Sequence, residues 1–314
     1  MLSRSTVVGA LVVAELAVVG LAVRSLGFGS GPDRPHVQMA MQMPDMTMPV
    51  MSMASAAVPA GGTVLGNGER TFATGPAPHV VVALENDARL IVRAADSGSV
   101  RVTLDLTKEG WPARPPIPLT ADATADGVRV AMAAPPSGVS FSMGGYDRTI
   151  TIEVPPNARV EISSAEGRVS TSGLQAPVRV RADDGTIEIR DQHGDVDART
   201  SDGRIVLANV DADRLVAHSA DGSIDANNVR LADGELTTDS GHVEVSASSA
   251  SDSVVAIHTD DGSVRIASGL SSENHSSSDD DDRQSRTVTL GSARGKFTIA
   301  TSDGHVSLSQ GAKV

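Results

Sequence analysis

The sequence predicts an all-β protein whose second half is a β-solenoid of stacked repeats with a period of 18 to 21 residues. Three observations support this prediction. A glycine recurs at steps of 18, 18, 19, 19, 21 and 42 residues, the last step being twice 21. An apolar residue lies five positions before each glycine, and a valine or isoleucine lies two positions after it. Aromatic residues make up only 2% of the chain, which suits a narrow aliphatic core. The glycines are Gly167, Gly185, Gly203, Gly222, Gly241, Gly262 and Gly304.

Residues 178–190 illustrate one repeat unit. Apolar and charged side chains alternate on both sides of Asp184 and Gly185, so each short strand has one apolar face. The Asp-Gly pair predicts a tight turn with positive φ at the glycine, which lacks the Cβ atom that disfavours this conformation. In six of the seven units a serine or threonine lies three positions before the glycine. We expect its hydroxyl to hydrogen-bond to the backbone of the turn.

Two architectures are compatible with this unit. In a β-solenoid, equivalent residues of successive coils stack about 4.8 Å apart, and each coil contacts only its neighbours. In an up-and-down antiparallel sheet, Asp-Gly would instead form a type I′ hairpin turn. The low aromatic content favours the solenoid, because the core of a sandwich about 10 Å thick normally recruits larger side chains.

The first 23 residues are predicted to form an N-terminal transmembrane helix or a signal segment. Residues 6–23 are almost wholly apolar and are flanked by Arg4 and Arg24. Eighteen helical residues span roughly 27 Å, just enough for one membrane crossing. The small residues Gly20 and Ala22 would suit signal-peptide cleavage, which is the alternative. In either case the remainder of the chain is expected to be exported.

Residues 24–62 are predicted to form a flexible linker rich in methionine and proline. Thioethers are soft ligands, and their close spacing here suits Cu(I), so we interpret the run as a candidate metal site. A low-complexity linker without a bound metal is the alternative. The methionines are Met39, Met41, Met43, Met46, Met48, Met51 and Met53.

A peptide that covers residues 36–55 tests the copper hypothesis. We expect it to bind Cu(I) but not Zn(II), because thioether sulfur prefers the softer ion. Titration of the peptide with each ion under reducing conditions measures this, and the absence of Cu(I) affinity would remove the hypothesis.

The remaining chain is predicted to contain two parts. Residues 63–160 alternate apolar and polar residues without a fixed period, which predicts an irregular β module that caps the repeats. Residues 161–314 form the β-solenoid repeats, with a disordered loop expected at 270–290 because serine and aspartate dominate there.

Composition and charge exclude several classes of function. The net charge of −13 argues against nucleic-acid binding and against electrostatic docking on anionic lipid. The chain has no cysteine, which excludes disulfides, thiolate catalysis and zinc–sulfur sites. No acid and base are singled out by the sequence, so we expect neither an enzyme nor a cofactor. Polysaccharide cleavage by a β-helix is a weak alternative.

Two groups of polar residues bear on metal binding. His218 and His258 share one predicted outward column, and His242 and His305 share another, but sequence-order stacking separates each pair too widely for one ion. The aspartates beside the repeat glycines should stack along one edge, where calcium is a candidate ligand and solvated turn residues are the alternative. Nearby arginines such as Arg199 and Arg204 are expected to neutralise that edge.

Two stretches carry a resemblance to a known family. They are residues 149–169, which enter the first repeat through Val154-Pro155-Pro156, and the repeated Ser/Thr-x-Asp-Gly-x-Val/Ile. Over residues 78–309 the chain resembles the adhesin-like β-strand-repeat family, a bacterial domain of unknown function. The resemblance implies a stacked β domain, often tethered to a membrane, without known catalysis.

These observations lead to one functional expectation and one alternative. We expect a non-enzymatic protein that is tethered to the cell membrane by a single N-terminal pass and presents an extended extracytoplasmic binding surface at the bacterial envelope. Its partner would be an envelope glycan, an envelope protein or another copy of the chain. The alternative is an accessory protein for envelope stress or Cu(I) handling that uses the methionine run.

Overall fold

The computed structural model describes residues 63–109, 117–134, 145–274 and 283–311, all of which belong to the compact unit Met53–Val314. These residues form β-strands and connections without a helix. None of the segments described there is a helix long and apolar enough to cross a bilayer. The predicted anchor at 1–23 and the linker at 24–62, with its seven methionines, lie outside the described residues.

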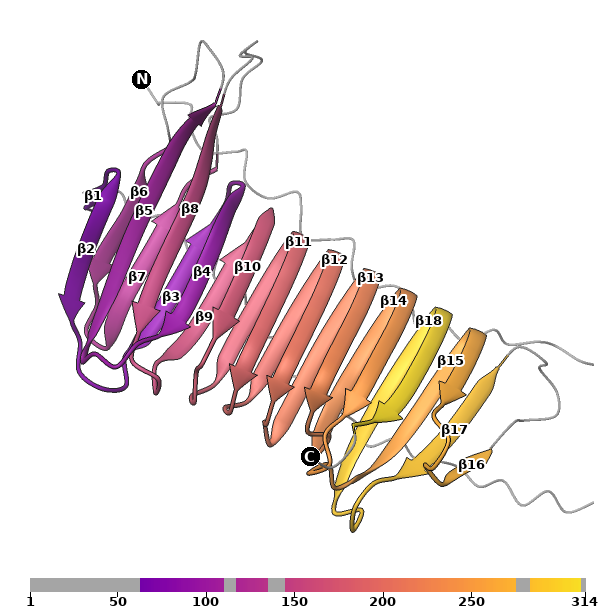
Figure 1. Ribbon diagram of the computed structural model, residues 1–314. Helices are drawn as coiled ribbons and strands as arrows, with labels where there is room; N and C mark the ends of the chain where they lie inside the picture. Colours follow the sequence, from indigo (N-terminus) through magenta and orange to yellow (C-terminus); the bar gives the residue numbers. More distant parts are fainter. Residues whose placement is uncertain (1–62, 110–116, 135–144, 275–282, 312–314) are drawn as a thin grey trace, which may run out of the picture. The chain divides into compact units, whose positions relative to one another are not determined.

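Eighteen strands make up the described part (Figure 1). They are β1 (Val64–Leu65), β2 (Gly68–Ala73), β3 (His79–Leu84), β4 (Ala88–Ala94), β5 (Ser99–Glu109), β6 (Leu119–Ala123), β7 (Gly127–Met132), β8 (Gly145–Val154), β9 (Arg159–Ser164), β10 (Gly167–Ser172), β11 (Val178–Gln192), β12 (Val196–Val210), β13 (Arg214–Val229), β14 (Asp233–Ala247), β15 (Ser253–Ile266), β16 (Ser272–Asn274), β17 (Gln284–Thr289) and β18 (Gly295–Gln310).

The repeats stack as parallel layers, which confirms the solenoid and excludes the hairpin alternative. Each of the long strands β11 to β15 and β18 forms one layer that runs through its repeat glycine, and neighbouring layers pair in register. Asp184 of β11, for example, is opposite Asp202 of β12, which is opposite Asp221 of β13. A hairpin at Asp-Gly would have paired the two halves of one strand with each other in antiparallel fashion.

The order of the layers differs from the order of the sequence at the C-terminal end. Strand β18 pairs in parallel with β14 on one side and with β15 on the other, so the last layer of the chain lies between two earlier ones (Figure 1). Stacking in sequence order, which the repeat spacing suggests, is therefore wrong for β15 and β18. The exchange is possible because both strands carry the same apolar columns and the same Asp-Gly pair.

The connection that returns to β18 is held by one carboxylate. Asp252 accepts a hydrogen bond from the backbone nitrogen of Ser292 at 2.6 Å and forms an ion pair with the Arg294 guanidinium. The hydrogen bond from Arg294 is the main reason that the pKa of Asp252 lies below its ordinary value. This pairing fixes the connection just before β18 begins.

The segment predicted as a disordered loop at 270–290 contains two strands, so that prediction is wrong for its described ends. β17 pairs with β15 in antiparallel fashion, and the short β16 pairs with β17. Val288 of β17 is buried and extends the core of β15, which explains why the strand forms despite its polar surroundings. Residues 275–282 lie outside the described residues.

The parallel stack also extends upstream of the sequence repeats. Strands β9 and β10 form the first repeat layer, and β3 and β4 pair with them in parallel. β7 and β8 add a further parallel layer on β3 and β4. Antiparallel pairing then takes over, with β6 on β7 and β5 on β8. Two layers of residues 63–160 therefore continue the geometry of the repeats.

Each layer has a first half before its glycine and a second half after it. The outward side of β7, β3, β9 and the first halves is called the first face below. The outward side of β8, β4, β10 and the second halves is called the second face. Between the two faces lies a core of aliphatic columns, such as Val178, Val196 and Leu215 from the first halves.

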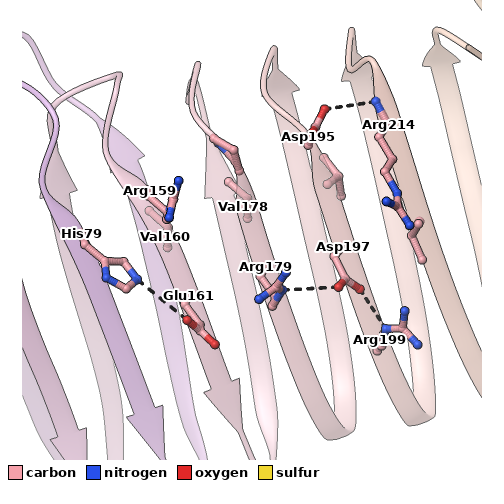
Figure 2. Close-up of a pocket in the computed structure, with 13 residues that line it drawn as sticks. His79, Arg159, Val160, Glu161, Val178, Arg179, Asp195, Asp197, Arg199 and Arg214 are labelled. Atoms are coloured by element: carbon pink, nitrogen blue, oxygen red, sulfur yellow. Dashed lines mark hydrogen bonds and ion pairs between the residues drawn. The ribbon is translucent and has the colours of Figure 1, made fainter. Parts of the chain in front are cut away.

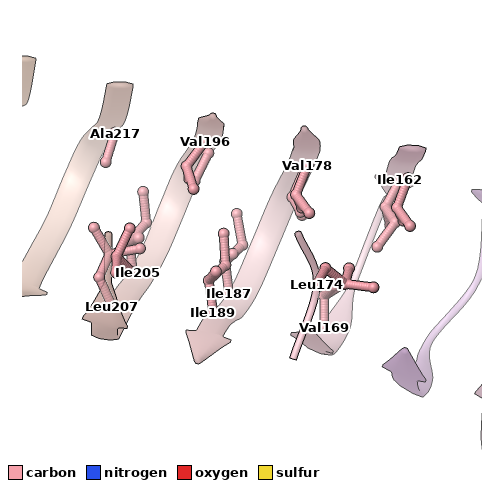
Figure 3. Packing of buried hydrophobic residues seen from close by; sticks show 14 of the residues in the cluster. Ile162, Val169, Leu174, Val178, Ile187, Ile189, Val196, Ile205, Leu207 and Ala217 are labelled. Atoms are coloured by element: carbon pink, nitrogen blue, oxygen red, sulfur yellow. The ribbon is translucent and has the colours of Figure 1, made fainter. Parts of the chain in front are cut away.

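The core columns are buried along most of the stack (Figure 3), whereas Val264 and Ile266 of β15 are only partly buried. Ile187 and Ile189 of β11 lie beneath Ile205 and Leu207 of β12, and all four side chains are closed to solvent. Each such side chain contributes about 1.5–3 kcal/mol to stability by leaving water. Among the described residues, Phe297 is the largest side chain that is fully buried, and it lies in the inserted β18.

The repeat glycines form a continuous column in which each backbone approaches the next very closely. A Cβ atom at Gly203 would lie 2.0 Å from the carbonyl oxygen of Gly185, and one at Gly222 would lie 1.9 Å from that of Gly203. Gly203 and Gly222 have φ outside the left-handed region, whereas Gly185 has φ of +121°. The predicted turn conformation is thus confirmed only in some layers, and close approach is the requirement that all of them share.

Five of the six hydroxyls in the column make the predicted hydrogen bonds, mostly between layers, whereas Thr259 Oγ1 is buried without a partner among the described residues. Thr238 donates to the carbonyl of Gly222 at 3.0 Å, and Ser219 donates to that of Gly203 at 3.2 Å. Both hydroxyls are buried beside the aliphatic core. Each one therefore satisfies a carbonyl at the corner where the preceding layer bends.

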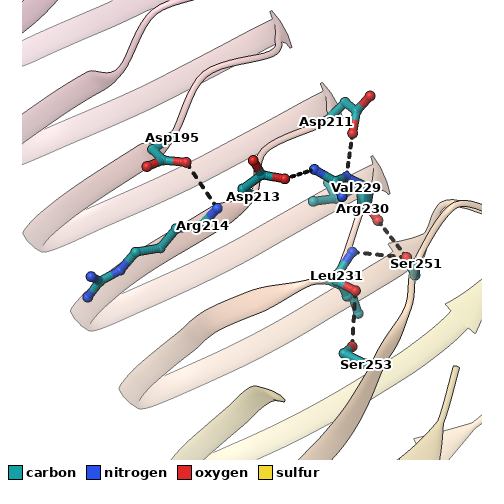
Figure 4. A network of polar contacts seen from close by, with 9 residues as sticks. All are labelled: Asp195, Asp211, Asp213, Arg214, Val229, Arg230, Leu231, Ser251 and Ser253. Carbon is teal, nitrogen blue, oxygen red and sulfur yellow. Dashed lines mark hydrogen bonds and ion pairs between the residues drawn. The ribbon is translucent and has the colours of Figure 1, made fainter. Parts of the chain in front are cut away.

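The opposite corner of the layers is fixed by polar side chains (Figure 4). The Arg230 guanidinium pairs with Asp211 and with Asp213, both at 2.5 Å, and the hydrogen bond that it donates to Asp213 is the main cause of its raised pKa. Nearby, Ser251 Oγ accepts from the backbone nitrogen of Leu231 at 2.9 Å. These contacts fasten the connections that follow β12, β13 and β14.

Candidate functional site

The first face carries a groove of about 440 Å³ that crosses β3, β9, β11, β12 and β13 (Figure 2). Charged side chains project into it because outward positions alternate with core positions along each of these strands. Its arginines are Arg159, Arg179, Arg199 and Arg214. Its carboxylates are Glu161, Asp195 and Asp197, so the lining carries a net charge of +1 on a chain with a net charge of −13.

Two of the arginines are held by one carboxylate at the floor of the groove. Asp197 accepts from Nε of Arg199 at 2.8 Å and forms an ion pair with Nε of Arg179 at 3.3 Å. Asp197 is only 24% exposed, so the pair of guanidinium groups is held in a defined position. One carboxylate cannot neutralise two guanidinium groups, and this part of the groove keeps a positive charge.

A histidine closes one end of the groove. His79 Nε2 lies 3.8 Å from the Glu161 carboxylate, and its Nδ1 lies 3.4 Å from Asp126. Hydrogen bonding from Thr124 is the main reason that the pKa of Asp126 is lowered. His79 therefore lies between two carboxylates at the β3 end of the groove.

The other two arginines are available to a ligand. Arg159 and Arg214 are exposed, and within the described ranges neither guanidinium has a hydrogen-bond or ion-pair partner. The backbone nitrogen of Arg214 donates to Asp195 at 3.1 Å, which fixes the start of β13 and leaves the side chain in the groove (Figure 2). The alternation of outward and core positions along each strand predicts that the side chains of Arg159 and Arg214 are exposed. Only the register between layers shows that they share one groove.

The structure corrects one expectation about the histidines. His242 and His305 are opposite each other on β14 and β18, with stacked rings whose centroids are 5.1 Å apart. They were expected to be far apart because the insertion of β18 cannot be inferred from the repeat spacing. His218 and His258 are separated by two intervening layers, β14 and β18, and hydrogen-bond to Thr237 and Ser285 respectively.

The stacked aspartate edge is confirmed, but the expected pairing of Arg199 and Arg204 with it is wrong. Arg204 pairs with Asp225 and Arg199 pairs with Asp197, both away from the edge. Across the described residues no group of three or more histidine, aspartate or glutamate side chains is arranged to hold a metal ion. The methionine run cannot be placed, since it lies outside those residues.

Comparison with known proteins adds a family to this geometry. The family model Toastrack DUF4097 matches residues 134–313, more than half of the chain. The chain belongs to this family. The Toastrack match covers every repeat layer from β9 to β18 and confirms the resemblance to a β-repeat domain of unknown function. The comparison with curated proteins found no match.

Solved structures show a distant likeness. A crystal structure of a "putative cell adhesion protein" from Clostridium sporogenes is 10% identical, with a TM-score of 0.35, over 79% of this chain and 100% of that one. A "putative adhesin" from Bacteroides fragilis is 10% identical, with a TM-score of 0.36, over 78% and 97% of the two chains. One from Parabacteroides merdae is 10% identical, with a TM-score of 0.35, over 79% and 97%. We base no inference on likeness at this level.

Proposed function

We propose that this Toastrack chain is a non-enzymatic binding protein that is exported and tethered to the cell membrane by its N-terminal segment. Its stacked layers would present an extended surface at the bacterial envelope. The observation that carries this proposal is the groove of the first face, in which side chains from consecutive layers line one continuous hollow. A ligand that extends along the stack can contact several layers at once.

An envelope glycan is the partner that the groove suits best. Arginine guanidinium groups bind carboxylate and phosphate groups through paired hydrogen bonds. Arg159 and Arg214 are free to do so, whereas Arg179 and Arg199 are fixed by Asp197 and supply charge. An envelope protein or another copy of the chain would match the charge of this groove less specifically.

Binding can be tested with the full chain in proteoliposomes. We expect purified envelope glycans to retain proteoliposomes that carry the wild-type chain, and the double variant Arg159→Glu/Arg214→Glu to abolish this retention. Arg265→Glu, an exposed site on β15 outside the groove, is the matched control and should be retained. Equal retention of all three would contradict a role for the groove, and release of sugar fragments would instead favour polysaccharide cleavage.

Location needs a separate measurement. A C-terminal tag on the full chain should be digested by protease added to intact spheroplasts, and it should sediment with the membrane fraction. A tag that is protected until the cells are lysed would contradict export.

The methionine run supports a second candidate function, Cu(I) handling, in which the stacked layers act as a spacer. Deletion of residues 36–55 separates the two candidates. Copper tolerance of the host should fall only if the run handles copper, whereas glycan retention should persist if the groove is the functional site.

A further inference from the structure

A second hollow, of about 430 Å³, lies on the second face where β8, β4, β10 and β11 run side by side (Figure 1). Three arginines line it, namely Arg89 of β4, Arg148 of β8 and Arg168 of β10. Gly167, Gly185 and Thr186 complete its side toward the repeats. This hollow shares no lining residue with the groove of the first face.

Two of these arginines are direct neighbours across the sheet. Arg89 and Arg168 are register partners on parallel strands, which lie about 4.8 Å apart. Like charges directly opposite each other are destabilising unless an opposite charge lies between them. Both side chains are exposed, and neither has an ion-pair or hydrogen-bond partner in the described part of the chain. The sheet therefore holds two guanidinium groups together without neutralising them.

The third arginine adds an unsatisfied donor. Nε of Arg148 is buried, and no hydrogen-bond acceptor reaches it among the residues that the structure describes. A buried N–H without an acceptor costs free energy, and more when the group is charged. An acceptor from a ligand would remove this cost.

The remaining lining leaves room for such a ligand. Gly167 and Gly185 contribute only backbone atoms to this part of the lining. Thr186 contributes a hydroxyl beside them. Asp87 and Asp147 also line the hollow, so three guanidinium groups face two carboxylates and the net charge is +1.

We propose that this hollow binds a tetrahedral oxyanion, a phosphate or sulfate group, bridged by Arg89 and Arg168 and hydrogen-bonded by Arg148. Guanidinium groups offer several N–H donors in a fixed fork that matches the oxygens of such an anion. The anion is either free in solution or carried by a sugar. The proposal stands apart from the envelope function, since it concerns a different face.

The test measures thermal stability of the full chain in neutral detergent. Inorganic phosphate, inorganic sulfate and glucose 6-phosphate are each compared with sodium chloride at the same ionic strength. We expect the wild-type Tm to rise with at least one of the three, because a ligand that binds only the folded state stabilises it. A response to all three would indicate the free ion, and a response to glucose 6-phosphate alone would indicate a sugar-borne group.

Arg168→Gln tests the geometry. In anion-free buffer its Tm should equal or exceed that of the wild type, because the like-charge contact is gone. Its affinity for the anion should fall about 10- to 100-fold, as expected for the loss of a charged hydrogen-bond donor. Arg265→Gln, on β15, should respond to the anion as the wild type does.

Three outcomes would overturn the proposal. The first is a wild-type Tm that does not rise above the chloride control with any of the probes. The second is an undiminished rise in Arg168→Gln. The third is a lower Tm for Arg168→Gln in anion-free buffer, which would show that this arginine stabilises the fold by itself.

Discussion

Replacing Gly203 by alanine should destabilise the protein by about 3 kcal/mol, the upper end of the usual range for overpacking. The added Cβ would lie 2.0 Å from the carbonyl oxygen of Gly185 and 3.1 Å from the hydroxyl of Thr200. The first contact involves backbone, which cannot rotate away as a side chain can. The two layers would have to separate locally, which would weaken the hydrogen bonds between them. The shift in the denaturation midpoint measures this effect.

Gly66→Ala provides the matched control for Gly203→Ala. Gly66 has open space around its Cβ position and φ outside the left-handed region. Alanine at this position should therefore change the free energy of unfolding of the protein by less than about 0.5 kcal/mol. Because Gly203 also has φ outside that region, backbone strain does not enter the comparison. Equal midpoints for the two variants would show that the layers tolerate a methyl group at this corner.

A disulfide between cysteines introduced on β14 and β18 should form only if the two strands are neighbours, so its presence or absence reports the position of β18. Thr237 of β14 and Ala300 of β18 are register partners, so the double variant Thr237→Cys/Ala300→Cys should form a disulfide within one chain. Neighbouring strands bring Cα atoms to a separation that a disulfide can bridge. The chain has no native cysteine, so the variant carries only the introduced pair. Non-reducing gel mobility and mass spectrometry measure the product.

The pair Thr237→Cys/His258→Cys distinguishes the observed order from sequence order. If β15 stacked directly on β14, these positions would be neighbours, since they lie four residues before Gly241 and Gly262. With β18 between them they are two strand spacings apart, about 9.6 Å, which exceeds the reach of a disulfide. Cross-linking of this pair, without cross-linking of Thr237 to Ala300, would contradict the insertion.

The period of the repeat was sufficient to predict the layers and their columns. Side-chain alternation around Asp184 and Gly185 gave the apolar and charged faces of each layer, and parallel stacking then brought like residues together. The role of the glycines was predicted only in part, because a turn and a close approach both require the absence of a Cβ atom. Gly203, whose φ lies outside the left-handed region, shows that the close approach between layers is the general requirement.

Other features could not be predicted because they depend on which layers are neighbours. β15 and β18 carry interchangeable patterns, so nothing local indicates that β18 lies beside β14. The contact between His242 and His305 follows from that order and was missed for the same reason. Likewise, Arg89 and Arg168 are 79 positions apart in the sequence, and β4 precedes the periodic region that would have aligned them.

The position of β18 also determines when the fold can be completed. Synthesis delivers β18 after β15, yet β18 lies between β14 and β15 in the stack. A ribosome that stops near residue 290 would therefore produce a protein that lacks an internal layer and has no register partner for β15 on the side of β14. Quality control that acts on this nascent chain would encounter two unpaired edges, on β14 and on β15, until the codons of β18 have been read.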